Sequence, residues 1–160
     1  FRIHEGELVL ADATVTGHLL DLTQAWAAAV EPPGDWGILL SGDSLQAVLE
    51  DLAPGSDSAG GDFSVRARIQ FLERQWQNVK LIWSDVRAFE PARRDVPMSW
   101  EIDSPEGQLQ GSLSVEAPLL EASEGEGPML PVDGLFKVGG ILSLDGRDYP
   151  VQGFIRHVQR

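Results

Sequence analysis

The sequence predicts an all-β protein, an antiparallel β-barrel or curled sheet with one short helix. Apolar and polar side chains alternate from Phe63 to Phe71 and again from Leu109 to Ala117. Successive side chains of a strand point to opposite faces, so this alternation predicts strands with one dry face and one wet face. Asp145 and Gly146 tolerate the positive φ angles of a type I′ turn and predict a hairpin. Helical patterns are scarce, which favours a barrel or a sandwich.

Further strands are predicted from β-branched and aromatic residues and from turn signals. The segment from Val79 to Phe89 is rich in both residue classes and places Trp83 on the same side as Val79. Residues 104–107 form a turn-forming set, so the strand over 98–102 should form a hairpin with the strand that begins at Leu109. The remaining predicted strands cover 7–10, 14–20, 135–144 and 147–158.

One segment has the spacing of a short helix. Asp43 or Ser44 can cap it, and Pro54 with Gly55 ends it. Its apolar residues recur at helical intervals and are Leu45, Val48, Leu49 and Leu52. The alanine-rich stretch over 24–30 could add a turn or two of helix.

Length and composition indicate one globular domain over residues 1–160. A chain of 160 residues buries about 70% of the surface of its unfolded form, which is enough for one substantial core. We interpret 31–35, 54–62 and 122–131 as connections, because the flanking strands need each other for burial. The five Trp and six Phe side chains can fill a small barrel or line a pocket in it.

The charge balance argues against nucleic acid as a partner. Twelve Lys and Arg face 25 Asp and Glu, a formal charge of −13, and the resulting field repels phosphate backbones and anionic lipid surfaces. The basic residues cluster only at Arg93 with Arg94 and at Arg156, His157 and Arg160, and we interpret both groups as solvated charge. The chain contains no cysteine, which excludes disulfides and thiolate sites and leaves the compartment open.

No segment is predicted to cross a membrane or to act as a signal peptide. Apolar runs fall short of the roughly 18 residues that a membrane helix needs. The first residues lack the basic-then-apolar pattern of a signal peptide. We expect a soluble chain and interpret Phe1 as a boundary within a longer or processed chain.

Catalytic and metal-binding motifs are weak. The sequence shows no phosphate loop, dinucleotide fingerprint or serine elbow, and His4, His18 and His157 are widely separated. We predict neither a metal nor a cofactor. Asp85 follows Trp83 in a predicted strand, where an inward carboxylate could exchange protons with a substrate; the simpler interpretation is that Asp85 faces water.

Aromatic residues are the candidate walls of a ligand cavity. Tyr149 has the same inward parity as His157 if no bulge intervenes at Gly153, so the two could orient a polar group of a ligand. Phe71, Trp83 and Trp100 lie in or beside predicted strands and would make apolar walls. Core packing alone also accounts for these aromatic residues.

Two passages within residues 96–160 carry a family resemblance. The first is a proline-tryptophan strand followed by a turn and a second strand, and the other is a closing hairpin with glycines and tyrosine. The residues concerned are Pro97, Met98, Ser99, Trp100, Glu101, Ile102, Pro105 and Gly107, and then Gly134, Phe136, Val138, Gly139, Gly146, Tyr149 and Gly153. In these passages the chain resembles the lipocalin-like carotenoid hydratase and AttH superfamily. Members of that superfamily usually pair two lipocalin-like halves, whereas this chain has the length of one.

The resemblance implies a calycin-type barrel that receives an isoprenoid-like or polyketide-like molecule. Some relatives add water across a double bond or cyclise the ligand, and Asp85 is the acid we would test first for such a role. Three hypotheses follow: a binder of a small apolar ligand, a packed structural or protein-interaction module with a protein partner, and a hydratase or cyclase.

Overall fold

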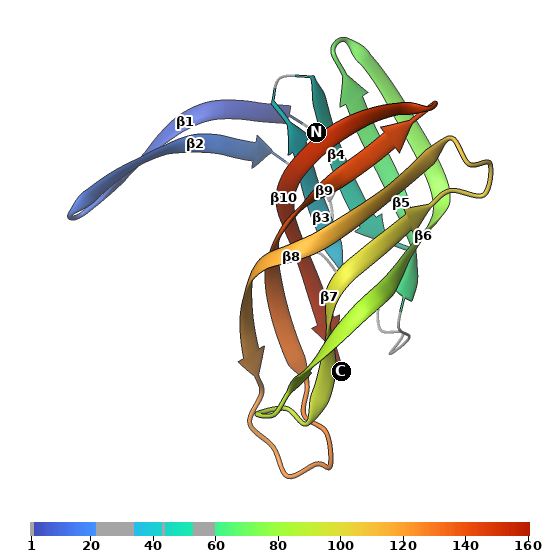
Figure 1. The fold of residues 1–160 in the computed structure, drawn as a ribbon. Coiled ribbons are helices and arrows are strands. Elements are labelled where there is room, and N and C mark those ends of the chain that lie inside the picture. Colours follow the sequence, from blue (N-terminus) through green and yellow to red (C-terminus); the bar gives the residue numbers. More distant parts are fainter. Residues whose placement is uncertain (1, 22–33, 43, 53–59) are drawn as a thin grey trace. The chain divides into compact units, whose positions relative to one another are not determined.

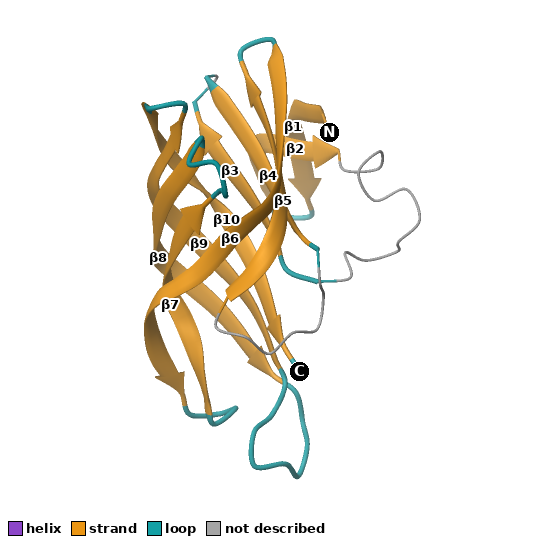
Figure 2. Cartoon of the chain, turned by 90° about the vertical axis from the view of Figure 1, so that its right-hand side faces the viewer, coloured by secondary structure: helices purple, strands orange, loops and turns teal. Residues whose placement is uncertain are grey.

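The computed structural model describes residues 2–21, 34–42, 44–52 and 60–160. These residues form strands joined by turns and loops, and none of them is helical (Figure 2). The all-β prediction is therefore confirmed for the part of the chain that is described. No helix among these residues is long and apolar enough to cross a membrane. The alanine-rich stretch over 24–30 lies outside the described residues.

The chain divides into two compact units, 1–33 and 34–160. In the first unit, β1 (Arg2–Leu10) pairs with β2 (Ala13–Asp21) as an antiparallel hairpin with an uninterrupted register. β1 contains the strand predicted over 7–10, and β2 contains the strand predicted over 14–20. Where the sequence predicts one barrel domain over 1–160, the barrel itself occupies only the second unit.

The second unit is a closed antiparallel barrel of eight strands (Figure 1). Each strand pairs with its neighbours in sequence, and β10 closes the barrel by pairing with β3 over Gln152–Arg156. This up-and-down order is the topology of lipocalin-like barrels. The strands are β3 (Trp36–Ser41), β4 (Leu45–Asp51), β5 (Gly60–Ile69), β6 (Leu72–Phe89), β7 (Arg94–Asp103), β8 (Leu109–Ala122), β9 (Val132–Leu144) and β10 (Arg147–Gln159).

The barrel interior is filled by the inward members of the alternating strands. Leu113, Phe136 and Leu142 are fully or almost fully buried. Trp100 meets Phe136 edge to face, with ring centroids 5.4 Å apart. The alternation of β8 ends at a bulge between Val115 and Ala117, and Ala117 is consequently exposed. The middle of the barrel is therefore a packed core.

The predicted short helix over 45–52 is wrong, because this segment forms β4. Leu45, Ala47 and Leu49 are buried at a period of two, and β4 pairs with β3 on one side and β5 on the other. Val48 is also buried, although it lies outside the main core cluster. Its apolar side chain completes the helical spacing of the sequence. The pairing of β4 with β3 and β5 overrides the local helical spacing. Asp43, one of the two predicted helix caps, lies outside the described residues.

Both predicted hairpins of the carboxyl-terminal half are confirmed. β7 pairs with β8 across the turn at 104–108, and β9 pairs with β10 across Asp145 and Gly146. Those two turn residues have φ angles of 49° and 78°, as a type I′ turn requires. The uninterrupted register of β9 and β10 continues through Gly153.

The two ends of the barrel differ in how their strands are connected. We name the end with the connections at 42–44, 70–71, 104–108 and 145–146 the turn end; it lies at the top of Figure 1. We name the opposite end, which holds the connections over 90–93 and 123–131 and the end of β10, the open end. β7 and β8 pair only over Ser99–Asp103 and Gln110–Ser114, so they part as they approach the open end.

Candidate functional site

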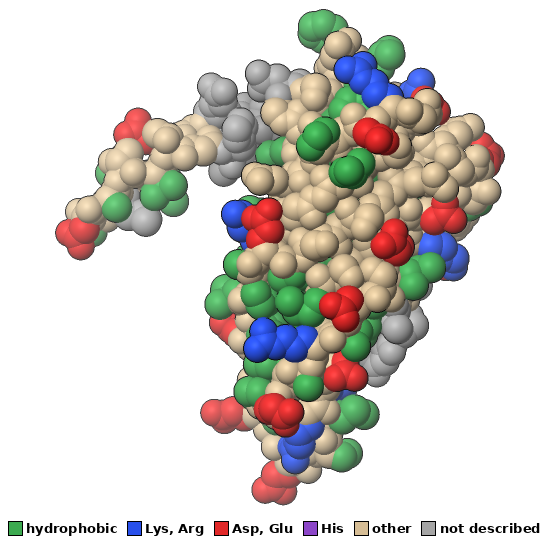
Figure 3. Space-filling view, viewed as in Figure 1, with side chains coloured by type: hydrophobic (Ala, Val, Ile, Leu, Met, Phe, Trp, Pro, Cys, Tyr) green, Lys and Arg blue, Asp and Glu red, His purple; other side chains and the backbone are tan. Residues whose placement is uncertain are grey.

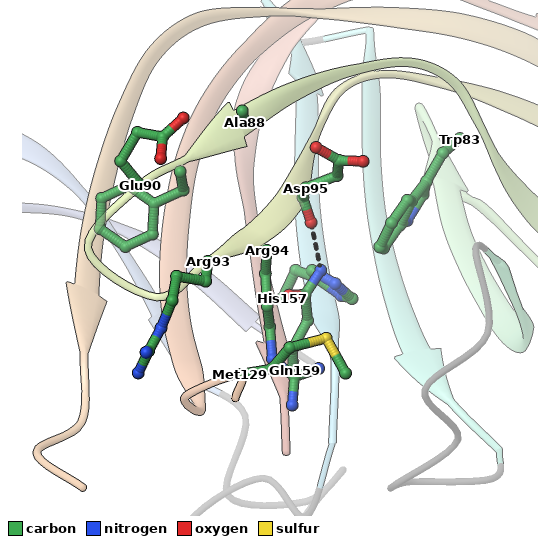
Figure 4. A pocket seen from close by; sticks show the side chains of 10 residues that line it. Trp83, Ala88, Glu90, Arg93, Arg94, Asp95, Met129, His157 and Gln159 are labelled. Atoms are coloured by element: carbon green, nitrogen blue, oxygen red, sulfur yellow. Dashed lines mark hydrogen bonds between the residues drawn. The ribbon is translucent and has the colours of Figure 1, made fainter. Parts of the chain in front are cut away.

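The open end of the barrel holds a pocket of about 480 Å³. Its lining comes from β6, β7, β10 and the loop between β8 and β9, as Figure 4 shows. The lining residues are Trp83, Ala88, Phe89, Glu90, Arg93, Arg94, Asp95, Met129, His157 and Gln159.

Backbone hydrogen bonds fix the loop that borders this pocket. The Leu130 N–H donates to the carbonyl of Ala92 at 3.0 Å, which ties the β8–β9 loop to the β6–β7 turn. Arg93 has a φ of 55°, and its Nη2 donates to the carbonyl of Gly127 at 2.7 Å. These bonds hold Met129 at the border of the pocket.

A bulge interrupts the part of β6 that lines the pocket. The register of β6 against β7 shifts between Trp83 and Asp85 and again between Asp85 and Val86. Bulges bend a strand and change the direction of its side chains, and they are frequent near binding sites. Here the bulge lies between two parts of β6 that both line the pocket, Trp83 before it and Ala88 with Phe89 after it.

Asp35 and His157 form a hydrogen-bonded pair beside the pocket. Asp35 Oδ2 contacts Nδ1 of His157, and the other carboxylate oxygen accepts from the Val158 N–H at 2.8 Å. The pairing of β3 with β10 stops at Trp36 and Arg156, so the carboxylate continues the ladder by one residue. Trp83 lies nearly perpendicular to the imidazole, with centroids 5.0 Å apart. The imidazole is thereby fixed by two partners.

Three buried polar atoms of the pocket residues have no hydrogen-bond partner within the described part of the chain. They are Nε2 of His157, Oε1 of Gln159 and Nε of Arg94. The opposite atoms of these side chains are engaged, since Gln159 Nε2 donates to the Asp95 carbonyl at 2.9 Å and Arg94 Nη2 to the Arg160 carbonyl at 2.6 Å. Buried polar groups in folded proteins almost always have a partner, so this cluster is unusual.

The pocket combines charges of both signs with apolar surface. Arg93, Arg94, Glu90 and Asp95 supply charges of both signs, and Trp83, Phe89 and Met129 supply apolar walls. No cluster of His, Asp and Glu suited to a metal ion occurs among the described residues. Figure 3 shows acidic and basic side chains interspersed on one face of the barrel, without a basic stripe there.

The structure brings together two of the predicted ligand-binding residues, Trp83 and His157. Trp100 belongs to the packed core. Tyr149 is buried and has the predicted inward parity with His157, because no bulge interrupts β10. Eight residues of strand nevertheless separate the two, about 26 Å at the usual rise. Tyr149 lies toward the turn end and does not share the pocket.

Two other predicted positions face solvent. Phe71, expected as a cavity wall, is 101% exposed in the turn between β5 and β6. The alternating pattern of β5 ends at Ile69, and Gln70 takes a φ of 56° to start the turn, so Phe71 leaves the strand before it can face inward. Asp85 is exposed and accepts a hydrogen bond from the Val86 N–H at 2.9 Å, in agreement with the simpler interpretation.

Sequence reasoning missed Asp35, Arg94, Met129 and Gln159. Arg94, interpreted from the sequence as solvated charge, is half-buried beside the pocket. Asp35 and His157 are separated by 122 positions in the chain. Only the closing pair of the barrel brings them together, and no local pattern in the sequence encodes that pairing.

Comparisons with protein families, with curated proteins and with solved structures found no match for this chain. The resemblance to the carotenoid hydratase and AttH superfamily stays a prediction from the sequence, while the eight-stranded antiparallel barrel rests on the structure itself.

Proposed function

We propose that this protein binds a small molecule with an apolar body in the pocket at the open end of its barrel. One observation carries the proposal: the pocket combines apolar walls with three buried polar atoms that have no partner among the described residues. A volume of about 480 Å³ falls within the usual range for small-molecule sites, which are mostly apolar with a few polar groups that orient the ligand.

The proposed site is at the mouth of the barrel and not along its axis. Leu113, Phe136 and Leu142 fill the middle of the interior. Trp100 and Tyr149 therefore act as core residues in this proposal, and the apolar contacts of the ligand come from Trp83, Phe89 and Met129. The exposed position of Asp85 gives no support to a hydratase or cyclase.

A dye titration tests the proposal. Anilinonaphthalene sulfonate, which joins aromatic rings to an anion, should bind the pure protein saturably at one site. Replacement of Trp83 by Ala should weaken this binding roughly tenfold, because a large aromatic contact is lost. The measurements are dye fluorescence for affinity and circular dichroism to confirm that the variant is folded.

Phe71→Ala is the matched control, since it removes an exposed aromatic residue at the other end of the barrel. It should bind the dye as the wild type does. Binding that does not saturate, or an equal loss in the two variants, would show non-specific adsorption and would contradict the proposal.

Protein interaction through the β1–β2 hairpin is a second candidate function. Leu8, Val9 and Val15 are exposed on this hairpin, and within the described residues each of its strands pairs only with the other. Free strand edges with apolar side chains favour pairing with another chain. Sedimentation at rising concentration tests self-association, which Val9→Lys should abolish; a wild-type chain that stays monomeric throughout would count against it.

A further inference from the structure

The pair formed by Asp35 and His157 restricts what the pocket can recognise. The His157 side chain is only 7% exposed, so a partner for its free Nε2 must approach from the pocket that the residue lines. Nδ1 is already engaged by Asp35. A carboxylate only accepts hydrogen bonds, so the proton of the neutral imidazole lies on Nδ1 and the lone pair lies on Nε2.

A second acceptor lies on the same face of β10. His157 and Gln159 are two residues apart, and both line the pocket. Gln159 uses its Nε2 as a donor to the Asp95 carbonyl, which leaves Oε1 as a free, buried acceptor. The pocket therefore presents two acceptors side by side, and Nε of Arg94 as a donor.

We propose that the ligand carries a hydroxyl group, or an equivalent neutral O–H or N–H donor, that donates to Nε2 of His157. Asp35 is a positioning residue in this arrangement, because it sets the tautomer that makes Nε2 an acceptor. The inference rests on the proposed function and adds to it the chemical class of the ligand: an apolar body that bears a hydroxyl.

A purely structural role explains only part of this geometry. The bond from the Val158 N–H to Asp35 extends the ladder between β3 and β10 and stabilises the end of the barrel. It accounts for one carboxylate oxygen. It gives Nε2 of His157, which is buried beside the pocket, no partner among the described residues, whereas a donor group of a ligand in the pocket would pair with this atom.

The decisive experiment compares two probes with the same apolar body, naphthol and its methyl ether, methoxynaphthalene. Naphthol can donate a hydrogen bond, and the ether can only accept one. We expect naphthol to bind the wild-type protein about tenfold more tightly, in line with the effect of leaving a buried acceptor unpaired. Quenching of tryptophan fluorescence or calorimetry measures both affinities.

Replacing His157 by Phe removes the acceptor and keeps a ring at the position. The affinity ratio of the two probes should then fall to about one, and any remaining ratio reports the size of the extra methyl group. Equal binding of the two probes to the wild type, or a ratio that His157→Phe leaves unchanged, would overturn the hydroxyl assignment and leave the proposed function intact. Failure of both probes to bind would contradict the proposed function as well.

Asp35→Asn tests the positioning role without removing the imidazole. The Val158 N–H donates to the side-chain oxygen, so the amide nitrogen introduced by this substitution faces Nδ1 of His157 and donates to it. The proton of the ring then moves to Nε2, which becomes a donor. We expect the preference for naphthol to disappear, and nitrogen NMR of His157 to show the exchange of tautomers.

Asp103→Asn is the matched control, because it makes the same charge change at an exposed residue that ends β7 at the turn end and does not line the pocket. It should keep the tenfold preference and the tautomer. If Asp35→Asn keeps the wild-type preference and tautomer, or if Asp103→Asn loses the preference equally, Asp35 does not position His157 and the assignment is wrong. Asp35→Asn also tests the hydroxyl assignment if His157→Phe fails to fold.

Discussion

The same eight strands form both ends of the barrel, but the two ends differ in the length of their connections. At the turn end, short connections join the strands, and positive φ angles at Gln70, Asp145 and Gly146 keep the turns tight. Leu109 and Leu144 are buried below these turns and pair across β8 and β9. At the open end, the β8–β9 loop is longer, and three buried polar atoms of the pocket residues have no partner within the part of the chain that the structure describes.

This difference shows how a scaffold can be separated from a site. A tight turn fixes the register of its hairpin and leaves little backbone to shape a cavity. A longer loop on a rigid frame can place side chains around a ligand, as the β8–β9 loop does with Met129. Substitutions at the turn end should therefore affect stability, and those at the open end should affect binding.

The largest expected effect is the loss of a core side chain at the turn end. Leu109→Ala should lower the free energy of unfolding by about 2–5 kcal/mol, because it removes a fully buried side chain and leaves a cavity. Urea denaturation measures the loss. Binding of the dye by the remaining folded protein should stay unchanged.

Met129→Ala is the counterpart at the open end, where the side chain is 55% exposed. It should change the free energy of unfolding by no more than about 0.5 kcal/mol and should weaken binding of the dye. An equally large loss of stability in both variants would remove the distinction between the ends.

A smaller effect is expected from the type I′ turn. Gly146 has a φ of 78°, and an added Cβ would meet nothing within 4 Å, so Gly146→Ala acts through the backbone alone. We expect a loss of about 1 kcal/mol, the cost of a left-handed conformation for an L-residue. Gly146→Asn should lose less, since Asn tolerates this region better. Equal stability of all three proteins by thermal unfolding would show that the turn does not depend on glycine.

Apart from β3, which was not predicted, and β4, which was predicted as a helix, the strands could be predicted from the sequence, and the reason is physical. Side-chain alternation in β5, β8, β9 and β10 is a local consequence of one face being buried, and Asp145 with Gly146 specifies a local turn. The helix predicted over 45–52 failed for the same reason. Burial of Val48 outside the main core adds an apolar position that local spacing cannot distinguish from a helical face.

The candidate site could be predicted only in part. Trp83 and His157 stood out as an aromatic residue and a titratable residue with inward parity. Asp35 becomes visible only when β10 closes on β3, and Met129 only when its loop is tied to the β6–β7 turn. Phe71 was misplaced because an alternating pattern does not reveal the residue at which a strand turns. Pairing between distant segments is a property of the closed barrel and not of any short segment.

The smallest expected effect concerns the ion pair between Arg74 and Asp145, which joins the start of β6 to the β9–β10 turn although these strands are not neighbours in the barrel. Both side chains are more than two-fifths exposed, at 44% and 45%. Arg74→Met should therefore cost about 0.5 kcal/mol at low salt, and this difference should vanish in concentrated salt. Urea denaturation at two ionic strengths measures it.

Arg87→Met is the control for this last substitution, because Arg87 is exposed on the same strand and forms no ion pair with any of the described residues. If Arg74→Met lowers the free energy of unfolding by well over about 1 kcal/mol, or if the loss persists in salt, the ion pair between Arg74 and Asp145 stabilises the turn end. If the loss is small, closure there depends on the apolar side chains beneath the turns, because surface ion pairs are screened while buried Leu109 and Leu144 are not. The ends then differ in their interiors: apolar Leu109 and Leu144 are buried at the turn end, and the open end holds a pocket in which buried Nε2 of His157 has no partner among the described residues.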